Sequence, residues 1–492
     1  MPLRLRFLLD TNILIPLQDS MVVLQPSLTD FVRLCNAHGH QLLFHPASLE
    51  DIGRDPDVAR RTRTLDRLRQ YTELQPGPAC LWNSPQTSAN DACDNDILYA
   101  LHRDAAHALV TEDQGLHRKA RERGLSDRVY FIQSAQDWMR RLHEPGQVRL
   151  PFIEDVELHT LTHQLQDSFF DSLREGYAGF DDWFRRKAQE GRRAWIYREN
   201  AGDSIAALCI YAIQTDEPIN DQGDRLLGIS LKLCTFKVGE QVRGRKVGEL
   251  FFRAAFQYAS DLKCEHIFLT ANDDRQKQLI ALVEDFGFRR AGFHNGDGVY
   301  VKNHPVQPPA IEMDSFEYLR RFYPHYMSGE GVQKFLIPIQ PNFHDILFPD
   351  YENPGHALPE GHPKRHVGNA IKLAYLCHAV SKQPRPGDVV LFYRSRDLRA
   401  VTTIGVVESY VCSTSADEIA RIVSRRTVYS ERQIAEMARR ETKVMLFRLV
   451  SHYKSAVSYD DLKRLRVVSG SIQSITKISD ESFSRILRAA ER

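Results

Sequence analysis

The sequence has no long apolar run: charged or polar residues interrupt every hydrophobic stretch before it approaches the roughly 18 residues that a membrane-spanning helix needs. It also lacks paired cysteines, because its eight cysteines are scattered without a Cys-x-x-Cys spacing. That pattern is typical of reduced thiols in a cytosol and not of a disulfide framework. Neither sign of charge predominates, because the sequence has 65 basic and 64 acidic residues. The sequence therefore predicts a cytoplasmic chain with no membrane partner, and its net charge alone does not indicate nucleic-acid binding.

The amino-terminal residues share one feature with a signal peptide, because Arg4 and Arg6 precede an apolar run. Asp10 and Asn12 interrupt that run, and no small-residue cleavage site follows. We therefore expect the run to form the first strand of a core.

The length of 492 residues suggests about three domains. Strands that alternate with helical patterns fill residues 1–143, which predicts a parallel α/β sheet. Residues 150–303 begin with helical patterns and pass into the strands and helices of a second α/β domain. Residues 311–492 have a β-rich centre with helices, and the stiff polar segment 304–309 predicts a linker before them. The predicted fold class is a multi-domain α/β chain.

Four carboxylates stand beside predicted strand or helix ends in the first block. Asp10 follows the first strand, Glu50 comes shortly after the second, Asp94 lies at a helix start, and Asp113 follows the third strand. In a parallel sheet these positions meet at one edge, where open α/β folds place their ligands. Their convergence predicts a divalent-cation site. The alternative is a set of helix caps and solvated loop ends, since Asp at a helix start is common.

Residues 3–140 resemble the PIN domain family of metal-dependent ribonucleases. The order Asp, Glu, Asp, Asp carries the resemblance, together with Leu-Asp-Thr-Asn at residues 9–12 and Val-Thr-Glu-Asp at residues 110–113. The resemblance implies one or two Mg²⁺ or Mn²⁺ ions that activate a water and stabilise the charge developing on a phosphate. Asp96 is the rival for the third ligand position. The implied catalytic metal ligands are Asp10, Glu50, Asp94 and Asp113.

A basic loop that contains glycines separates a long predicted strand from a predicted helix in the second block. It reads Gln-Val-Arg-Gly-Arg-Lys-Val-Gly over residues 241–248. Backbone amides at such a helix start can bind a pyrophosphate, and glycine lets the ligand approach closely. The alternative is an ordinary glycine-containing turn with basic residues.

Residues 243–248 resemble the acetyl-CoA loop of the GNAT acetyltransferases, (Gln or Arg)-x-x-Gly-x-(Gly or Ala), except that Lys246 replaces the first glycine. A lysine does not easily adopt a positive φ, but its ammonium could meet a phosphate directly. Residues 282–288 resemble the Gly-Phe corner of the same family. The acetyl-CoA contacts that the resemblance implies are Val238, Arg243, Gly244, Arg245, Lys246, Val247, Gly248 and Asn272.

The resemblance to the acetyltransferases leaves the catalytic acid and base open. Val283 stands where many members of the family have a tyrosine acid, and the strand at residues 231–235 has no glutamate base. Tyr300 is an alternative proton donor, although a tyrosine in a strand is usually a core or surface residue.

Residues 330–492 resemble ASCH and PUA-like β-barrels, chiefly through Gly-Asp-Val-Val-Leu-Phe at residues 387–392. An apolar helix is expected after residues 368–372. Such barrels hold RNA or a modified base in a cleft, with basic side chains on phosphates and aromatic ones on bases. The arginine pairs at 425–426 and 439–440 are predicted to be helix-surface charge. The residues expected to bind RNA are Lys372, Tyr393, Arg394 and Arg396; a solvated face is the alternative.

Together these patterns predict an RNA-directed protein that combines a PIN-type ribonuclease with an acetyl-CoA-dependent GNAT-type acyltransferase. Its RNA would be tRNA or another structured RNA, and a toxin-like role would add a protein inhibitor or antitoxin as a partner. One alternative is an N-acetyltransferase of a protein or small molecule, with the flanking modules used for recognition. Another is a non-catalytic CoA-binding sensor or scaffold. The tRNA substrate and the toxin-like role rest on fold-level analogy.

Overall fold

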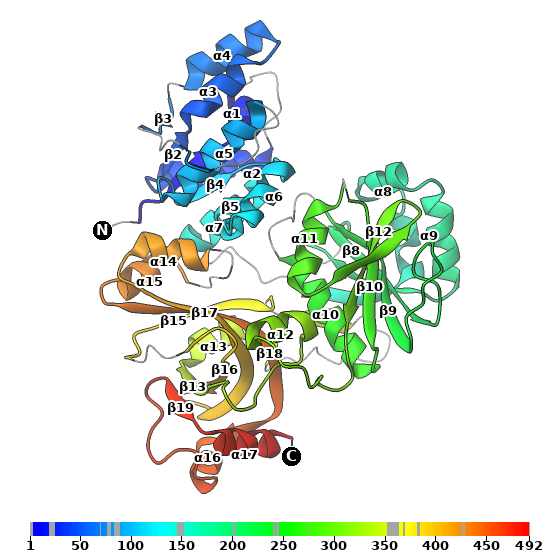
Figure 1. Ribbon diagram of the computed structural model, residues 1–492, viewed down its shortest axis with the longest axis vertical. Helices are drawn as coiled ribbons and strands as arrows, with labels where there is room; N and C mark the ends of the chain where they lie inside the picture. Colours follow the sequence, from blue (N-terminus) through cyan, green and yellow to red (C-terminus); the bar gives the residue numbers. More distant parts are fainter. Residues whose placement is uncertain are drawn as a thin grey trace.

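The computed structural model describes residues 3–18, 25–68, 70–75, 80–82, 89–144, 152–199, 203–239, 242, 246–273, 275–351, 364–367, 370–380, 384–424, 426 and 429–491. The chain forms a first module (residues 3–144), a second (152–303) and a third (311–491), drawn in blue to cyan, in green, and in yellow to red in Figure 1. Within the described ranges, no helix is both long and apolar enough to cross a membrane.

The first module is built on a five-stranded, all-parallel sheet with the order β3-β2-β1-β4-β5. Phe7 and Leu9 pack with α2 and α7 on one face, while Leu8 packs with α5 and α6 on the other. Both faces are therefore covered, which explains the nearly continuous apolar strands. The strands are β1 (Arg6–Leu9), β2 (Gln41–Phe44), β3 (Thr72–Glu73), β4 (Ala108–Val110) and β5 (Val129–Tyr130). The helices are α1 (Thr11–Gln18), α2 (Pro26–Ala37), α3 (Pro46–Gly53), α4 (Val58–Leu68), α5 (Ala89–His102), α6 (Gln114–Glu122) and α7 (Ile132–His143).

The second module is built on an eight-stranded sheet with the order β11-β12-β10-β9-β8-β7-β6-β14. Its strands are antiparallel except for the parallel pair β9 and β10. The strands are β6 (Phe152–Glu157), β7 (Arg193–Tyr197), β8 (Ala207–Thr215), β9 (Ile229–Val238), β10 (His266–Ala271), β11 (Arg289–His294), β12 (Asp297–Asn303) and β14 (Lys364–Val367). The helices are α8 (Asp171–Gly176), α9 (Phe180–Gln189), α10 (Val247–Asp261) and α11 (Lys277–Asp285).

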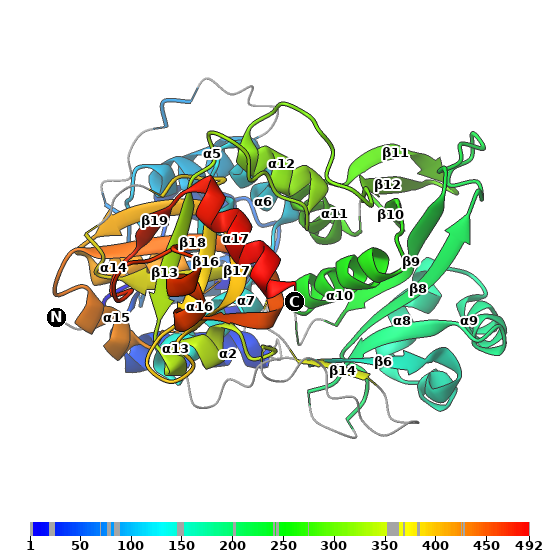
Figure 2. The same ribbon diagram turned by 90° about the horizontal axis from the view of Figure 1, so that it is seen from below.

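Two features of this sheet differ from the sequence-based expectations. The module opens with a strand, β6, and not with helices. The strand β14 comes from the chain after residue 311, yet it pairs with β6 at the edge of the second module's sheet (Figure 2). A short edge strand carries little local signal, because its place depends on a distant partner.

The third module holds a mixed six-stranded sheet with the order β15-β18-β17-β16-β13-β19. Its long strands β17 and β18 bend at three shifts of register, as bulged strands do. The end strands β15 and β19 are not neighbours among the described residues, so these pairings do not close the expected barrel. The strands are β13 (Lys334–Ile339), β15 (Lys372–Cys377), β16 (Val389–Arg394), β17 (Ala400–Ser413), β18 (Thr442–Ser458) and β19 (Thr476–Ile478). The helices are α12 (Ser315–Phe322), α13 (Pro341–Leu347), α14 (Ala416–Val423), α15 (Glu431–Met437), α16 (Tyr459–Arg464) and α17 (Asp480–Ala490).

The apolar helix expected after residues 368–372 is the strand β15, so that prediction is wrong. Leu373 and Tyr375 face a core inside the third module, whereas Ala374 and Leu376 face the core of the first. Burial on both faces produces a continuous apolar run, and periodicity alone does not separate such a strand from a buried helix.

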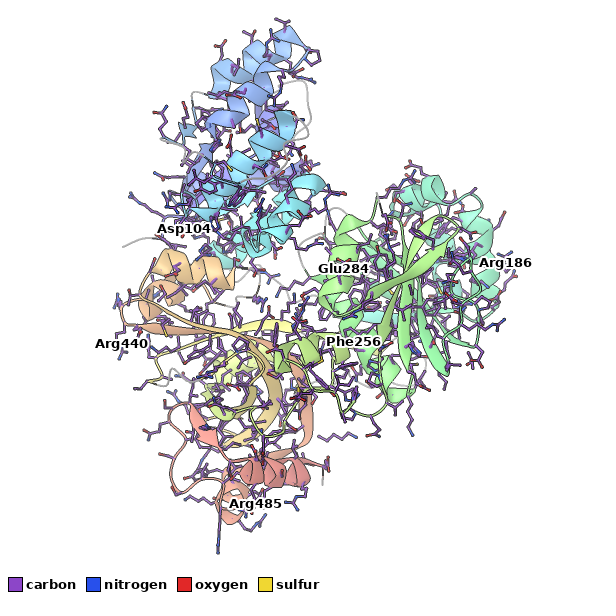
Figure 3. The ribbon with its side chains drawn as sticks, in the orientation of Figure 1. Asp104, Arg186, Phe256, Glu284, Arg440 and Arg485 are labelled. Carbon is purple, nitrogen blue, oxygen red and sulfur yellow. The ribbon has the colours of Figure 1, made fainter. Side chains whose placement is uncertain are left out.

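The third module connects the other two through shared cores. Tyr429 and Ile434 of α15 lie in the same hydrophobic cluster as the α2–α7 face of the first module. The helices α14 and α15, orange in Figure 1, lie next to that module. Phe256 of α10 in the second module, labelled in Figure 3, packs against Tyr323 of the third. Their ring centroids are 5.1 Å apart. The first and second modules also meet directly, where Arg121 and Glu284 form an exposed ion pair.

Candidate functional site

Asp10 occupies the turn between β1 and α1, at the carboxyl edge of the parallel sheet, and is only 6% exposed. Its Oδ1 accepts the backbone N–H of Thr11 at 2.8 Å. Its Oδ2 accepts from Asn12 Nδ2 at 2.7 Å and from the Thr111 hydroxyl at 2.6 Å. Burial raises the pKa of Asp10 to about 6 in spite of these hydrogen bonds, and the charges of Asp94 and Asp113 add to the rise.

Two more carboxylates reach the same edge from separate helices. Asp113 caps α6, accepting the N–H groups of residues 115 and 116 through one oxygen, Oδ1. Asp94 lies on α5, where burial raises its pKa above the usual range and Asp113 and Asp91 raise it further. Lys119 Nζ lies 2.7 Å from Asp94 Oδ2 and 2.6 Å from Asp91 Oδ1, and it lowers the pKa of Asp94. The edge is therefore an acidic cluster with one ammonium beside it.

Glu50 does not join this cluster in the same way. It lies exposed on α3. The pKa of Asp96 is raised first by the burial of Asp96 and second by the charge of Glu50. The residue of α3 that contacts the edge is Asp51, whose Oδ2 accepts the Thr11 hydroxyl at 2.8 Å. The structure thus gathers Asp10, Asp94 and Asp113 and sets Glu50 beside Asp96.

Thr111 is the residue of this edge that the sequence reasoning missed. Its hydroxyl donates to Asp10, accepts from Asn12 Nδ2 at 3.1 Å and accepts from the backbone N–H of Asp113 at 2.9 Å. It is fully buried at the end of β4. The Val-Thr-Glu-Asp motif contained it, but only the folded edge shows that one hydroxyl joins the Asp10 carboxylate to the Asp113 backbone.

The chemistry of the acidic edge suits a hard divalent cation. Carboxylate and hydroxyl oxygens are ligands that Mg²⁺ and Mn²⁺ prefer. Burial raises the pKa of both Asp10 and Asp94, and a bound cation would favour the charged form of each. Among the described residues, no three carboxylates of the edge bring their oxygens within 4.8 Å of one another. A bound ion would therefore draw them closer or use water as further ligands.

In the second module, the parallel strands β9 and β10 part before they end. Their pairing stops at Leu233 and Leu269, although β9 continues to Val238 and β10 to Ala271. The segment of β9 beyond residue 233 stays paired with β8 alone. The two strands are therefore no longer paired at their carboxyl ends, and α10 begins shortly after β9.

Lys246 lies at the amino end of α10 with a φ of 60°, so this lysine does take the left-handed conformation that its side chain disfavours. Its ammonium does not project into open space: Nζ donates to the Lys372 carbonyl at 3.0 Å. Glu249, one turn into α10, accepts the Lys372 backbone N–H at 2.6 Å. Burial lowers the pKa of Lys246 to about 7. The third module therefore contacts the start of α10, while Arg243, Gly244 and Arg245 lie outside the described residues.

The remaining residues expected at acetyl-CoA make contacts within the protein. A Cβ on Gly248 would lie 3.1 Å from Leu282 Cδ2, so this glycine allows α10 and α11 to pack closely. Val247 is buried in the core, and Val238 packs against the same core while partly exposed. Asn272 donates through Nδ2 to Asp297 Oδ1 at 3.0 Å.

The two positions considered for the catalytic acid, Val283 and Tyr300, also make contacts within the protein. Val283 is fully buried on α11. Tyr300 on β12 donates to Asp273 Oδ1 at 3.0 Å and accepts from Arg290 at 2.9 Å. Burial raises the pKa of Tyr300. A base facing the parted strands is not evident among the described residues.

Of the residues expected to contact RNA, Arg396 is exposed, with a φ of 68°. Lys372 pairs with Asp285 of the second module, and burial lowers its pKa to about 8. Tyr393 is 4% exposed and lies inside a core of the third module. Arg394 is 7% exposed and pairs with Asp345 and Asp397 at 2.5 and 2.7 Å. Its guanidinium stabilises the module and does not point to solvent, because a buried cation needs such partners.

The prediction that the arginine pair at 425–426 is helix-surface charge is wrong for Arg426, which is buried. It is 7% exposed and makes a two-pronged ion pair with Glu408, at 2.7 and 3.0 Å. Arg448 is fully buried and bridges Glu408 to Asp285 of the second module, the latter at 3.0 Å. With Lys372, these residues form a buried ionic network between the second and third modules.

No protein-family model matches this chain, and no curated protein matches it. Solved structures similar to parts of it include the ASCH protein of Zymomonas mobilis, at 15% identity and a TM-score of 0.25 over 32% of this chain and 94% of that one. The PaiA N-acetyltransferase of Thermoplasma acidophilum in complex with coenzyme A matches at 14% identity and 0.23, over 31% and 99%. NAA60 of Arabidopsis thaliana in complex with acetyl-CoA matches at 18% and 0.24, over 31% and 98%. At these values the likenesses assign neither a family nor a function to the chain.

Proposed function

We propose that the protein is an RNA-directed nuclease whose first module cleaves phosphodiesters with Mg²⁺ or Mn²⁺. The observation that carries this proposal is the convergence of Asp10, Asp94 and Asp113, from three separate elements, at the carboxyl edge of one parallel sheet. Carboxylates that repel one another in a buried place are costly unless a cation joins them. A structural cap role explains Asp113 alone, but not the buried Asp10, whose pKa is raised to about 6.

The residues of the edge have distinct roles in this proposal. Asp10, Asp94 and Asp113 hold the cation, with Asp51 or Glu50 as the further carboxylate from α3. The bound ion would lower the pKa of a water and neutralise charge on the phosphate. Thr111 and Asn12 fix the Asp10 oxygens through their hydrogen bonds. Lys119 partly offsets the negative charge beside Asp94.

Cleavage of RNA by the purified full chain, with Mg²⁺ or Mn²⁺ and with EDTA, tests the proposal. Asp10→Asn should lower the rate by at least about 100-fold, since removal of groups that only support a ligand already costs about 10- to 100-fold. Glu122→Gln, at the exposed end of α6, is the matched control and should keep the wild-type rate. Undiminished cleavage by Asp10→Asn would refute the nuclease proposal.

A second candidate function, binding of acetyl-CoA for acyl transfer, is favoured by the parting of β9 and β10. Among the described residues, β10 pairs with β9 only as far as Leu233, so an extended ligand could add to the sheet beside residues 234–238. The acyl acceptor would be a protein, a small molecule or the RNA itself. Calorimetry with acetyl-CoA tests this function. Loss of binding in Gly248→Trp, with thermal unfolding recorded to check the fold, would support it, and absence of binding by the intact chain would exclude it.

A CoA-binding sensor or scaffold without turnover is the third candidate, favoured by the contacts of Lys246 and Glu249 with the third module. Binding of acetyl-CoA without acetylation of any added RNA or protein would separate it from the transferase. The third module would hold the RNA through exposed residues such as Arg396. A protein inhibitor of the nuclease remains part of the proposal, and co-purification from the native host tests it.

A further inference from the structure

Arg54 follows the last residue of α3 and lies beside the acidic edge of the first module. Its Nη2 donates to Asp51 Oδ1 at 2.9 Å, to Asn90 Oδ1 at 3.2 Å and to Cys93 Sγ at 3.5 Å. Asn90 and Cys93 both belong to α5, in its first turns. The guanidinium therefore connects two helices that border the edge.

Asp51 links this arginine to the centre of the acidic edge. Its second oxygen, Oδ2, accepts the Thr11 hydroxyl at 2.8 Å, and the same hydroxyl lies 3.3 Å from Asp10 Oδ1. Asp51 and Thr11 alone therefore separate the guanidinium from Asp10. An arginine stays protonated in proteins, so this chain of contacts places a permanent positive charge next to the proposed cation site.

The guanidinium keeps donors that the rest of the protein does not use. Within the described ranges, Nη1 and Nε of Arg54 have no hydrogen-bond partner, and the side chain is 39% exposed. Guanidinium N–H groups form short, charge-assisted hydrogen bonds with phosphate oxygens. Arg54 can therefore bind an external anion without giving up its contacts with α5.

Lys119 is the other cation beside the acidic edge, and its surroundings differ. Its Nζ lies 2.6 Å from Asp91 Oδ1 and 2.7 Å from Asp94 Oδ2, and its side chain is 23% exposed. Two carboxylates of the protein thus offset its charge, whereas Arg54 faces one carboxylate, one amide oxygen and one thiol. Of the two cations, Arg54 is the better suited to an anionic ligand.

The turn after Arg54 brings a second arginine to the same side of the edge. Arg61 donates to the backbone carbonyls of Gly53 and Asp55, at 3.5 and 3.1 Å. The Asp55 carboxylate makes a two-pronged ion pair with Arg60, at 2.6 and 2.7 Å. Among the described residues, no carboxylate forms an ion pair with Arg61. The end of α3 and the start of α4 therefore carry positive charge that an anionic chain would meet.

A plain surface ion pair is the alternative reading of Arg54, because Arg54 and Asp51 have the spacing of a common helix pair. Arg33 and Asp30 of α2 form such a pair with the same spacing, at 2.6 Å. That pair lies away from the edge, since α2 packs on the opposite face of the sheet from α5. The contacts with α5 and the link through Asp51 to the acidic edge distinguish Arg54 from it.

We propose that Arg54 binds a phosphate of the RNA that neighbours the cleaved one, and so holds the substrate at the acidic edge. This inference rests on the proposed nuclease function. The carboxylates of the edge repel the RNA backbone, and a cation at the rim of the edge offsets that repulsion. Arg54 is a substrate-binding residue in this proposal and takes no part in the bond cleavage itself.

RNA binding in EDTA tests the contact without cleavage, with Asp10→Asn as the inactive background. In that background, Arg54→Gln should weaken the binding of a short single-stranded RNA about tenfold, as loss of one hydrogen bond to a charged group does. The slope of log affinity against log salt concentration should become shallower by about 0.7, the value of one phosphate contact with a single strand. Arg54→Lys keeps the charge and should restore the slope. Arg33→Gln is the matched control and should change neither quantity, and thermal unfolding checks the fold of each variant.

Mn²⁺ binding separates a substrate contact from a purely positioning role. Arg54→Gln removes a positive charge beside Asp51, so its Mn²⁺ affinity should not fall below that of the wild type. Lower Mn²⁺ affinity with unchanged RNA affinity would overturn the proposal and make Arg54 a positioning residue of the edge.

Cleavage assays distinguish failure of this contact from failure of the nuclease. Binding and cleavage of RNA by Arg54→Gln at the wild-type level would overturn the Arg54 contact alone. RNA binding that depends on Arg54, in a wild-type chain that cleaves no RNA with Mn²⁺, would refute the nuclease and leave the contact in place. Absence of RNA binding by the intact chain would overturn both.

Discussion

The acidic edge of the first module and the start of α10 in the second module occupy equivalent places, each at the carboxyl ends of parallel strands. At the acidic edge, Asp10 and Asp94 face other groups of their own module and carry raised pKa values. At α10, Lys246 and Glu249 are hydrogen-bonded to β15 of the third module. A local motif can therefore bring polar groups to the carboxyl ends of parallel strands. Contacts between modules then determine whether those groups are available to a ligand.

The largest expected effect is on stability, and it tests whether the buried ionic network between the second and third modules stabilises the fold. Glu408→Gln leaves the buried Arg426 without its carboxylate and weakens the bridge through Arg448. Loss of one partner from a buried ion pair costs about 3–5 kcal/mol, so the free energy of unfolding should fall by that amount. Urea unfolding measures it, with exposed Glu436→Gln as the control. Wild-type stability in Glu408→Gln would show that the network contributes nothing and would weaken the comparison.

Thr111→Val tests whether the hydrogen bonds of the acidic edge position its carboxylates. It removes the hydroxyl that holds Asp10 Oδ2 and the Asp113 backbone while keeping the shape of the side chain. RNA cleavage should fall about 10- to 100-fold, as it does when groups supporting a metal ligand are lost. Thr62→Val, which removes only an exposed hydrogen bond within α4, should have no effect on the rate. Equal rates for the two variants would mean that Thr111 does not position the site.

The protonation of Asp10 predicts how cation binding depends on pH. Because its pKa is raised to about 6, Mn²⁺ must displace a proton below that pH, and affinity should fall by up to about tenfold per pH unit. The folded protein binds this proton more tightly than the unfolded chain, so Asp10 by itself makes stability rise as pH falls from about 6 to about 4. Mn²⁺ titration of wild type and Asp10→Asn checks the prediction, and a pH-independent affinity would contradict it.

Lys119→Met gives the smallest expected effect. Its ammonium pairs with Asp91 and Asp94, so its removal increases the negative charge that a cation experiences. Mn²⁺ affinity should rise a few-fold, by roughly the 1 kcal/mol that a partly exposed charge contributes near a protein surface. Lys187→Met, on the distant α9, is the control. Weaker Mn²⁺ binding in Lys119→Met would mean that the lysine orders the site.

Much of the first module could be predicted from the sequence. Apolar runs that end in Asp10 and Asp113 carry a local signal, and the parallel sheet places both at one edge, as expected. The choice between Glu50 and Asp51 could not be predicted, because neighbouring residues of a short helix differ in direction by about 100° and packing of α3 decides which one faces inward. The prediction for β15 failed for a related reason: burial on two faces conceals the period of a strand.

The sequence by itself determined the strands of the first module's sheet and the carboxylates that follow them, because short-range patterns of apolar and polar residues specify them. Only the tertiary structure decided which groups meet. Lys246 finds its carbonyl 126 positions away, and His143 finds Glu431 288 positions away. Such pairings depend on how whole modules pack, since buried polar groups take whatever partners the shared cores bring within reach. The acidic edge could therefore be predicted from the sequence of its own module, whereas the contacts of α10 and the bond from His143 to Glu431 could not.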